Sequence, residues 1–228
     1  MPSPISPNTQ AGAAVYSPFA LKVYDWWVLG VSNRWAWQCS TDKVLLPFYR
    51  RHVGSRHLDV GVGTGFYLAH AGFGDDQRIA LLDLNENSLR AASSRLGQSG
   101  TEVFVQDVMQ PLTALSGKRY DSIALFYLLH CLPGDMPGKA CVFAHLKSHL
   151  AQDGVLYGAT ILGDSAGHNV MGRKLMTVYN EKGIFGNRND TYEALHHALH
   201  QHFEQVEVSL HGKVACFSAR LPRLTASG

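Results

Sequence analysis

The chain has 228 residues, enough for one sizeable domain and short for two, and 20 Lys and Arg against 18 Asp and Glu give it a net charge of +2. Neither sign of charge runs in blocks, so the composition excludes the basic surface of a nucleic-acid binder and predicts no membrane partner. The apolar runs are all far shorter than the roughly 20 residues that cross a bilayer. Four dispersed cysteines without a CxxC motif argue against a zinc ribbon or a disulfide framework. We therefore expect a cytoplasmic protein.

The N-terminal quarter of the chain is expected to form a helical cap. Residues 1–14 have the composition of a disordered leader, without the basic and apolar regions of a signal peptide. The segment 19–37, FALKVYDWWVLGVSNRWAW, holds all four tryptophans of the chain. Asp42 is expected to cap a helix over 43–53 that Pro47 interrupts. The single domain then spans 15–228, and its aromatic cap spans 15–56.

From residue 57 the chain alternates short apolar runs with helical segments, which predicts a parallel sheet with helices on both faces. The helix over 138–151 is expected to end at the turn Gln152-Asp153-Gly154. This cofactor-binding core spans 57–162. We expect its strands at 57–62, 79–84, 102–107, 120–129 and 154–162.

The C-terminal part changes style. Residues 163–190 form a long insertion, which we expect to act as a lid or substrate segment. Asp190-x-x-Glu193 predicts a capping box for a helix over 191–203. Two strands joined by the short turn His211-Gly212 must then pair antiparallel, which completes the segment 191–228. The predicted fold is α/β, a seven-stranded doubly wound sheet that is mostly parallel and ends in an antiparallel hairpin.

The stretch HLDVGVGTGF, residues 57–66, places glycines at alternate positions directly after the first strand. A dinucleotide site of the G-x-G-x-x-G type needs a third glycine where this chain has Phe66. Asp59 lies two residues before the first glycine, where it would repel a pyrophosphate and attract an amino group. These residues disfavour a nicotinamide dehydrogenase and favour an amino-acid-like ligand without phosphates.

Two further acids follow the next two strands. Asp83 ends the second strand, where a carboxylate can accept both hydroxyls of a ribose. Asp107 follows the third strand, where a short acid can bind the exocyclic amine of adenine. Because carboxyl ends of parallel strands meet at one edge of a sheet, the three acids together describe an aminoacyl nucleoside, S-adenosylmethionine (SAM).

Residues 57–162 resemble the cofactor half of class I SAM-dependent methyltransferases, and are similar to the small-molecule branch of that family. The resemblance is carried by LDVGVGTG, LLDLNENSL, VFVQDV and IALFYLLHCL. It implies methyl transfer with SAM as cofactor. It also implies a set of cofactor-binding residues: Asp59, Gly61, Gly63, Gly65, Asp83, Leu84, Asp107, Val108 and Tyr127.

Candidates for catalysis lie beyond the fourth strand and in the insertion. His130 occupies the position that faces the methyl group in the family, and an imidazole titrates near neutrality, so we expect it to be the general base and to contact substrate. The alternative is that His130 caps a helix or bonds a backbone carbonyl. Tyr179 is the second catalytic candidate. The sequence YLLH here is not the D/N-P-P-Y of amino methylases, which disfavours nucleic-acid or protein amide methylation.

The aromatic cap predicts an apolar, flat or polycyclic substrate, because aromatic walls bury much area at little cost in entropy. The alternative is that these rings are the ordinary core of a helical cap. The expected substrate-binding residues are Tyr16, Tyr24, Trp27, Trp37 and His130.

The predicted function is SAM-dependent methyl transfer to an O, N or C nucleophile of a small metabolite, with cyclisation or rearrangement on the same fold as the alternative. No metal is expected, since there is no acidic cluster for Mg²⁺ and His196 and His200, one helical turn apart, have no third ligand in the sequence. We expect a small-molecule partner and leave a homodimer open.

Overall fold

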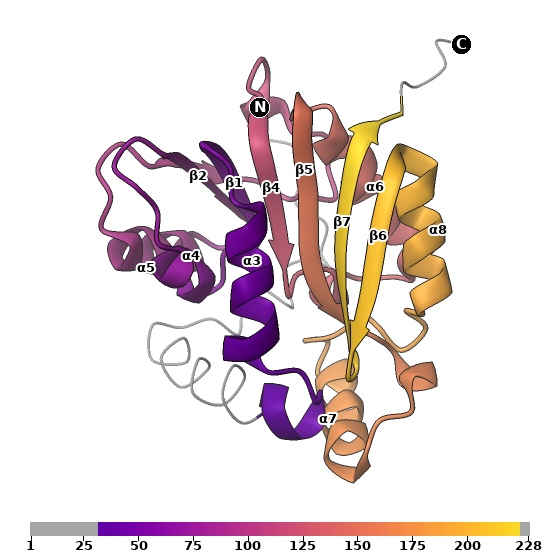
Figure 1. Cartoon of the computed structure of the whole chain (residues 1–228). Helices are drawn as coiled ribbons and strands as arrows, with labels where there is room; N and C mark the ends of the chain where they lie inside the picture. The colour runs from indigo at the N-terminus through magenta and orange to yellow at the C-terminus, as the bar shows by residue number, and fades with distance from the viewer. Residues whose placement is uncertain (1–31, 224–228) are drawn as a thin grey trace.

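The computed structural model describes residues 32–223, so the substrate candidates Tyr16, Tyr24 and Trp27 and the predicted leader lie outside the described residues. One seven-stranded sheet runs through the molecule with helices on both of its faces (Figure 1). The strands are β1 Arg56–Val60, β2 Arg78–Asp83, β3 Glu102–Val105, β4 Tyr120–Phe126, β5 Leu150–Ile161, β6 Phe203–His211 and β7 Val214–Pro222.

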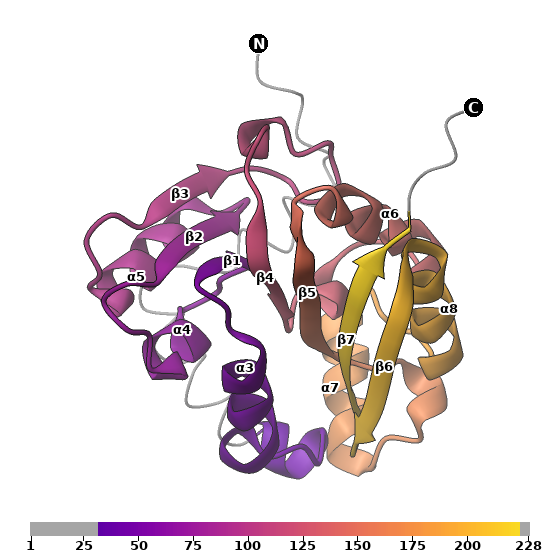
Figure 2. The ribbon, with the colours of Figure 1, turned by 45° about the horizontal axis from the view of Figure 1, so that its top comes forward.

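The described helices fall into two groups. Those before β3 pack against one face of the sheet, whereas α6 and α8 lie side by side on the other (Figures 1 and 2). The first group is η2 Thr41–Leu45, α3 Leu46–His52, α4 Phe66–Ala71 and α5 Glu86–Leu96. The later helices are η3 Thr113–Leu115, η4 Leu129–Cys131, α6 Met136–Lys147, η5 Asp164–Ala166, α7 Val170–Glu181 and α8 Tyr192–His202.

The strand order is β3-β2-β1-β4-β5-β7-β6, with parallel pairing from β3 to β5 and antiparallel pairing of β7 with both neighbours. The strand arrows in Figure 1 show the reversed direction of β7. This confirms the predicted parallel sheet with an antiparallel C-terminal hairpin. The order reverses between β1 and β4, and ligands of open α/β sheets bind outside the carboxyl ends of the strands at such a point.

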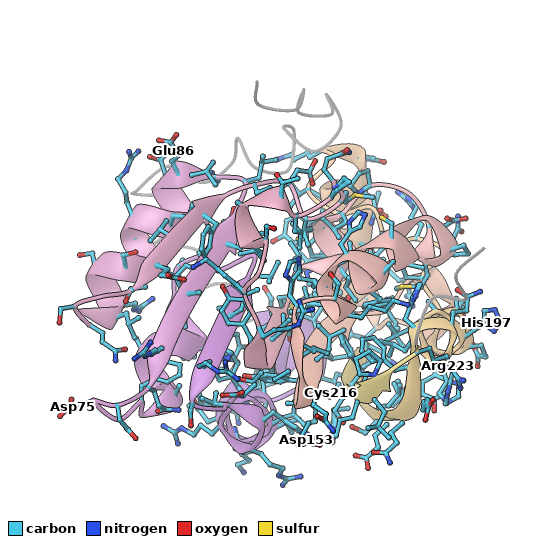
Figure 3. The ribbon with its side chains drawn as sticks, turned by 90° about the horizontal axis from the view of Figure 1, so that it is seen from above. Asp75, Glu86, Asp153, His197, Cys216 and Arg223 are labelled. Atoms are coloured by element: carbon cyan, nitrogen blue, oxygen red, sulfur yellow. The ribbon has the colours of Figure 1, made fainter. Side chains whose placement is uncertain are left out.

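Burial explains the strand sequences. The central strands β1, β4 and β5 are covered on both faces, so most of their residues are buried in unbroken runs rather than at alternate positions. The hydrophobic core is split by the sheet into clusters, one with α6 and α8 and another with α3. Charged side chains such as Asp75, Glu86 and Arg223 lie at the periphery, whereas Cys216 of β7 is buried (Figure 3).

Three predicted local features differ in the structure. Ser40, not Asp42, caps η2, and Pro47 stands where η2, a π-helical turn, passes into α3. Thr191 caps α8, so the capping box expected from Asp190 is wrong; the Asp190 side chain is used in a buried ion pair. The turn expected at 152–154 is also wrong, because β5 already begins at Leu150.

Candidate functional site

The glycine loop between β1 and α4 uses its three glycines differently. Gly61, Gly63 and Gly65 all have left-handed backbone conformations, with φ of +73°, +53° and +71°. A Cβ on Gly61 would lie 2.7 Å from a Leu128 methyl carbon, and one on Gly65 would lie 2.7 Å from the Ala92 Cα in α5. A Cβ on Gly63 would meet nothing within 4 Å. The first and third glycines therefore permit close packing, whereas the middle one faces open space.

That space is an open pocket of about 950 Å³, mouth included, at the carboxyl ends of β1, β2 and β4. Of the predicted cofactor residues, the pocket brings together Gly61, Gly63, Asp83, Leu84, Asp107, Val108 and Tyr127. Asp59 and Gly65 are not among its lining residues. The other lining residues were not predicted to be site residues: Val60, Val62, Thr64, Phe66, Tyr67, Leu82, Ser88, Gln106, Phe126, Leu128, Cys131 and Leu132.

Asp83, the last residue of β2, contributes a desolvated carboxyl group to the pocket. Its carboxylate accepts the backbone N–H of Asn85 at 2.8 Å and interacts with the N–H groups of Val62 and Gly63. Burial raises its pKa to about 6, and the nearby charge of Asp59 adds to this rise against the effect of the hydrogen bonds. A partly desolvated carboxylate of this kind is suited to accept hydroxyl groups from a ligand.

Asp107 stands beyond the end of β3 with its side chain buried. Its Oδ1 accepts the backbone N–H of Met109 at 2.9 Å, which orients the carboxylate. Val108 beside it is buried as well and lines the same pocket. Two acids and a glycine loop at one sheet edge thus surround a pocket whose other walls are apolar and aromatic, a composition that fits an adenosyl amino acid.

Asp59 lies behind the glycine loop rather than on the pocket surface. It is buried, and the Tyr49 hydroxyl of α3 donates a hydrogen bond of 2.5 Å to its Oδ2. The Tyr49 oxygen is also 2.9 Å from Nε2 of His57, whose Nδ1 is 2.8 Å from the Ser122 hydroxyl. Its expected contact with an amino group stays a prediction.

His130 lies on η4, adjacent to the pocket but not among its lining residues. Its Nδ1 accepts the backbone N–H of Ile161 at 3.3 Å and lies 3.4 Å from the Thr160 hydroxyl. The neutral ring then carries its proton on Nε2, which leaves no acceptor nitrogen. Burial, with a smaller effect from the charge of Lys139, lowers its pKa to about 3. The His130 ring is thus used in contacts with β5. Its role as a general base stays a prediction, and this geometry does not favour that role.

Two aromatic candidates are placed in packed surroundings. Trp37 is 1% exposed, with its ring edge-on to His168 and tilted against Phe185. Trp37 is therefore a core residue rather than a pocket wall, as in the alternative in which the aromatic rings form the ordinary core of the cap. Tyr179 of α7 is half-buried and its ring meets Phe185 edge-on at 4.9 Å between centroids. Neither residue lines the pocket, so their substrate and catalytic roles stay predictions.

The insertion 163–190 is anchored to the sheet edge at several points. The Asn187 side chain donates to the Ile161 carbonyl, and the Gly186 N–H donates to the His130 carbonyl, both at 2.9 Å. Lys139 of α6, fully buried, donates to Asp190 Oδ2 at 2.5 Å and to the Gly186 carbonyl at 3.0 Å. These bonds connect the insertion to β5, to α6 and to η4, which carries the pocket residue Cys131.

Residues 32–223 hold no group of three or more His, Cys, Asp or Glu side chains placed to bind a metal. The rings of His196 and His200 lie 4.4 Å apart on α8, and the neighbouring His197 points outward from that helix (Figure 3). Within the same residues, every helix is too short or too polar to span a bilayer.

Comparison with known proteins finds similarity to methyltransferases. A family model described as "Methyltransferase domain" matches residues 58–156. The chain is 50% identical over 192 residues, 84% of it and 98% of the relative, to the uncharacterized protein YbcY of Escherichia coli (strain K12). It is 41% identical over 216 residues, 95% of it and 97% of the relative, to the Physcion biosynthesis cluster O-methyltransferase of Aspergillus chevalieri.

Solved structures share the fold. The DhpI–SAH complex matches with a TM-score of 0.65 at 14% identity, over 93% of this chain and 96% of that one. The fold of this chain is therefore one that also occurs in a protein solved with S-adenosylhomocysteine (SAH). The chain belongs to the class I SAM-dependent methyltransferases and is an enzyme that uses SAM as its cofactor.

Proposed function

We propose that this methyltransferase methylates a phenolic oxygen of a small, apolar, aromatic metabolite. The observation that carries this proposal is the group of four aromatic rings in the pocket wall, Phe66, Tyr67, Phe126 and Tyr127. Aromatic walls of this kind suit a flat apolar ligand. The printed name of the Aspergillus chevalieri relative, an O-methyltransferase of a biosynthesis cluster, supports an oxygen acceptor.

The chain's own residues divide the pocket into a cofactor end and an acceptor end. Asp83 would accept the ribose hydroxyls, Asp107 would orient the adenine amine, and the Gly63 backbone would lie against the amino-acid portion, with the charge of Asp59 behind it. The open space at Gly63 and the desolvated Asp83 carboxyl both fit this assignment. When bound, SAM supplies a methyl group on a sulfonium centre that an oxygen nucleophile can attack.

The protonation states of the site favour a phenol over an aliphatic alcohol. Burial raises the pKa of the Cys131 thiol to about 12, and the buried His130 ring has a pKa of about 3, so neither exchanges a proton readily near neutrality. A phenol, with a pKa near 10 as in tyrosine, is much closer to ionisation than an alkyl alcohol. Positioning the acceptor and excluding water are then the main tasks of the pocket.

A matched acceptor panel tests the proposal. The purified protein is incubated with SAM and a hydroxylated anthraquinone, its hydroxymethyl counterpart or its aryl amine, and S-adenosylhomocysteine (SAH) and product masses are measured. We expect the phenol alone to gain one methyl group with one SAH formed. The Asp83→Asn variant should lose this activity. Tyr120→Phe should keep it, because Tyr120 is the first residue of β4 and the pocket lies at the other end of the strands. Methylation of the amine or of carbon in preference to oxygen would overturn the proposal.

A further inference from the structure

A chain of buried polar groups runs from the edge of β4 to the first acid of the site. The Gly54 N–H donates to the Ser122 hydroxyl at 2.8 Å, and Ser122 lies 2.8 Å from Nδ1 of His57. The Tyr49 oxygen lies 2.9 Å from the other ring nitrogen, and its proton is donated to Asp59. The side chains of His57, Ser122 and Tyr49 are fully buried.

The direction of every bond in this chain follows from the one at Asp59. Because Tyr49 donates its only proton to the carboxylate, its oxygen must accept from His57, so Nε2 of the ring carries the proton. Nδ1 then accepts from the Ser122 hydroxyl, whose oxygen accepts the Gly54 N–H. All donors point toward the carboxylate, and aligned hydrogen bonds in a buried site strengthen one another.

Tyr49 also connects this chain to the pocket wall. Its ring stacks on Tyr67 at 5.6 Å and meets Phe126 edge-on at 4.9 Å, and both of these rings line the pocket. Burial, together with the charge of Asp59, raises the pKa of Tyr49 well above its usual value, so the hydroxyl remains a donor. Asp59 is close enough to Asp83 to raise the pKa of that carboxyl, which places its charge at the cofactor end.

We propose that Tyr49 is a positioning residue for cofactor binding, which together with His57 and Ser122 fixes the Asp59 carboxylate behind the glycine loop for the α-amino group of SAM. A hydrogen bond donated to a carboxylate favours its charged form and fixes its orientation. The inference rests on the assignment of Asp59 to the amino-acid end of the cofactor, which belongs to the proposed function. It extends the site to α3, a helix that does not line the pocket.

The test compares two ligands that differ at the amino-acid end. Isothermal titration is carried out with SAH and with methylthioadenosine, which keeps the adenosine and the thioether but has no amino acid. Tyr49→Phe is expected to weaken SAH binding about tenfold and to change methylthioadenosine binding less than about twofold. Asp59→Asn should do the same, and the double variant should be no weaker than Asp59→Asn alone, because Tyr49 acts through Asp59.

Tyr120→Phe is the matched control, since it removes another buried tyrosine hydroxyl at the far edge of the sheet. Methylthioadenosine binding shows in each variant that the pocket is folded. Unchanged SAH binding by Tyr49→Phe, or equal weakening of both ligands, overturns the inference. If Asp59→Asn itself does not separate the two ligands, the assignment of Asp59 under the proposed function fails instead, which is a different result.

Discussion

Asp83 is expected to make the stability of the ligand-free protein depend on pH. Its pKa rises from 3.8 to about 6 because the half-buried carboxylate is desolvated, and 1.36 kcal/mol per pKa unit converts this to about 3 kcal/mol. A raised carboxyl pKa means that the folded protein binds more protons than the unfolded chain between about pH 4 and 6. The free energy of unfolding therefore falls as the pH rises through this window.

The variant Asp83→Asn isolates this effect. An amide also changes hydrogen bonds with the loop N–H groups, but that change is independent of pH. Between about pH 4.5 and 7.5, the stability of the variant relative to wild type is expected to improve by about 2 kcal/mol, the part of the total that falls in this range. Urea unfolding at a series of pH values measures it. A stability difference that stays flat across this range would refute the reasoning.

The same carboxyl sets the pH dependence of cofactor binding. If the ionised form accepts the ribose hydroxyls, SAH affinity in wild type falls by roughly tenfold per unit below about pH 6, because the pocket must first release a proton. The Asn variant binds weakly and without this dependence. Titration calorimetry measures both proteins, and wild-type affinity that is constant down to about pH 5 contradicts the assignment.

Further variants test the glycine loop, the buried ion pair and the role of His130. Gly63→Ala is expected to weaken SAH binding at least about tenfold and to destabilise the fold by roughly 1 kcal/mol. Gly65→Ala, whose Cβ would collide with α5, should lose about 1–3 kcal/mol of stability. Calorimetry and thermal unfolding separate the two effects, and equal losses of binding and stability in both variants would contradict the different roles of the two glycines. Lys139→Met should lower the free energy of unfolding by about 3–5 kcal/mol, because Asp190 is left buried without its partner. Adding Asp190→Leu should restore most of this stability. Urea unfolding measures both variants, and additive losses would refute the pairing. His130→Asn should leave the kcat–pH profile between about pH 6 and 9 unchanged, since the wild-type ring stays neutral there, and loss of an ascending limb in the variant would restore the base role.

Local signals in the sequence were sufficient for the sheet and the acids. The apolar runs in β4 and β5 reflect strands that are buried on both faces. Asp83 is the last residue of β2, and Asp107 comes two residues after the end of β3. Since carboxyl ends of parallel strands share an edge, these acids could be placed in one pocket without coordinates.

Contacts between distant segments were not predictable in this way. Asp190 has the spacing of a capping residue, yet its side chain binds Lys139, 51 positions earlier in the chain. Thr191 caps α8 instead. Tyr49 gives no sequence signal, because its role depends on the approach of α3 to β1. Trp37 could not be distinguished from a pocket wall, since core and ligand-facing aromatics have the same pattern.

The most direct test of the central claim is to follow a labelled methyl group from SAM during turnover of a phenolic acceptor. The account predicts that the label appears on the phenolic oxygen, with one SAH formed for each product molecule. An isomeric product formed while the label remains in SAM would contradict methyl transfer and favour the cyclisation alternative.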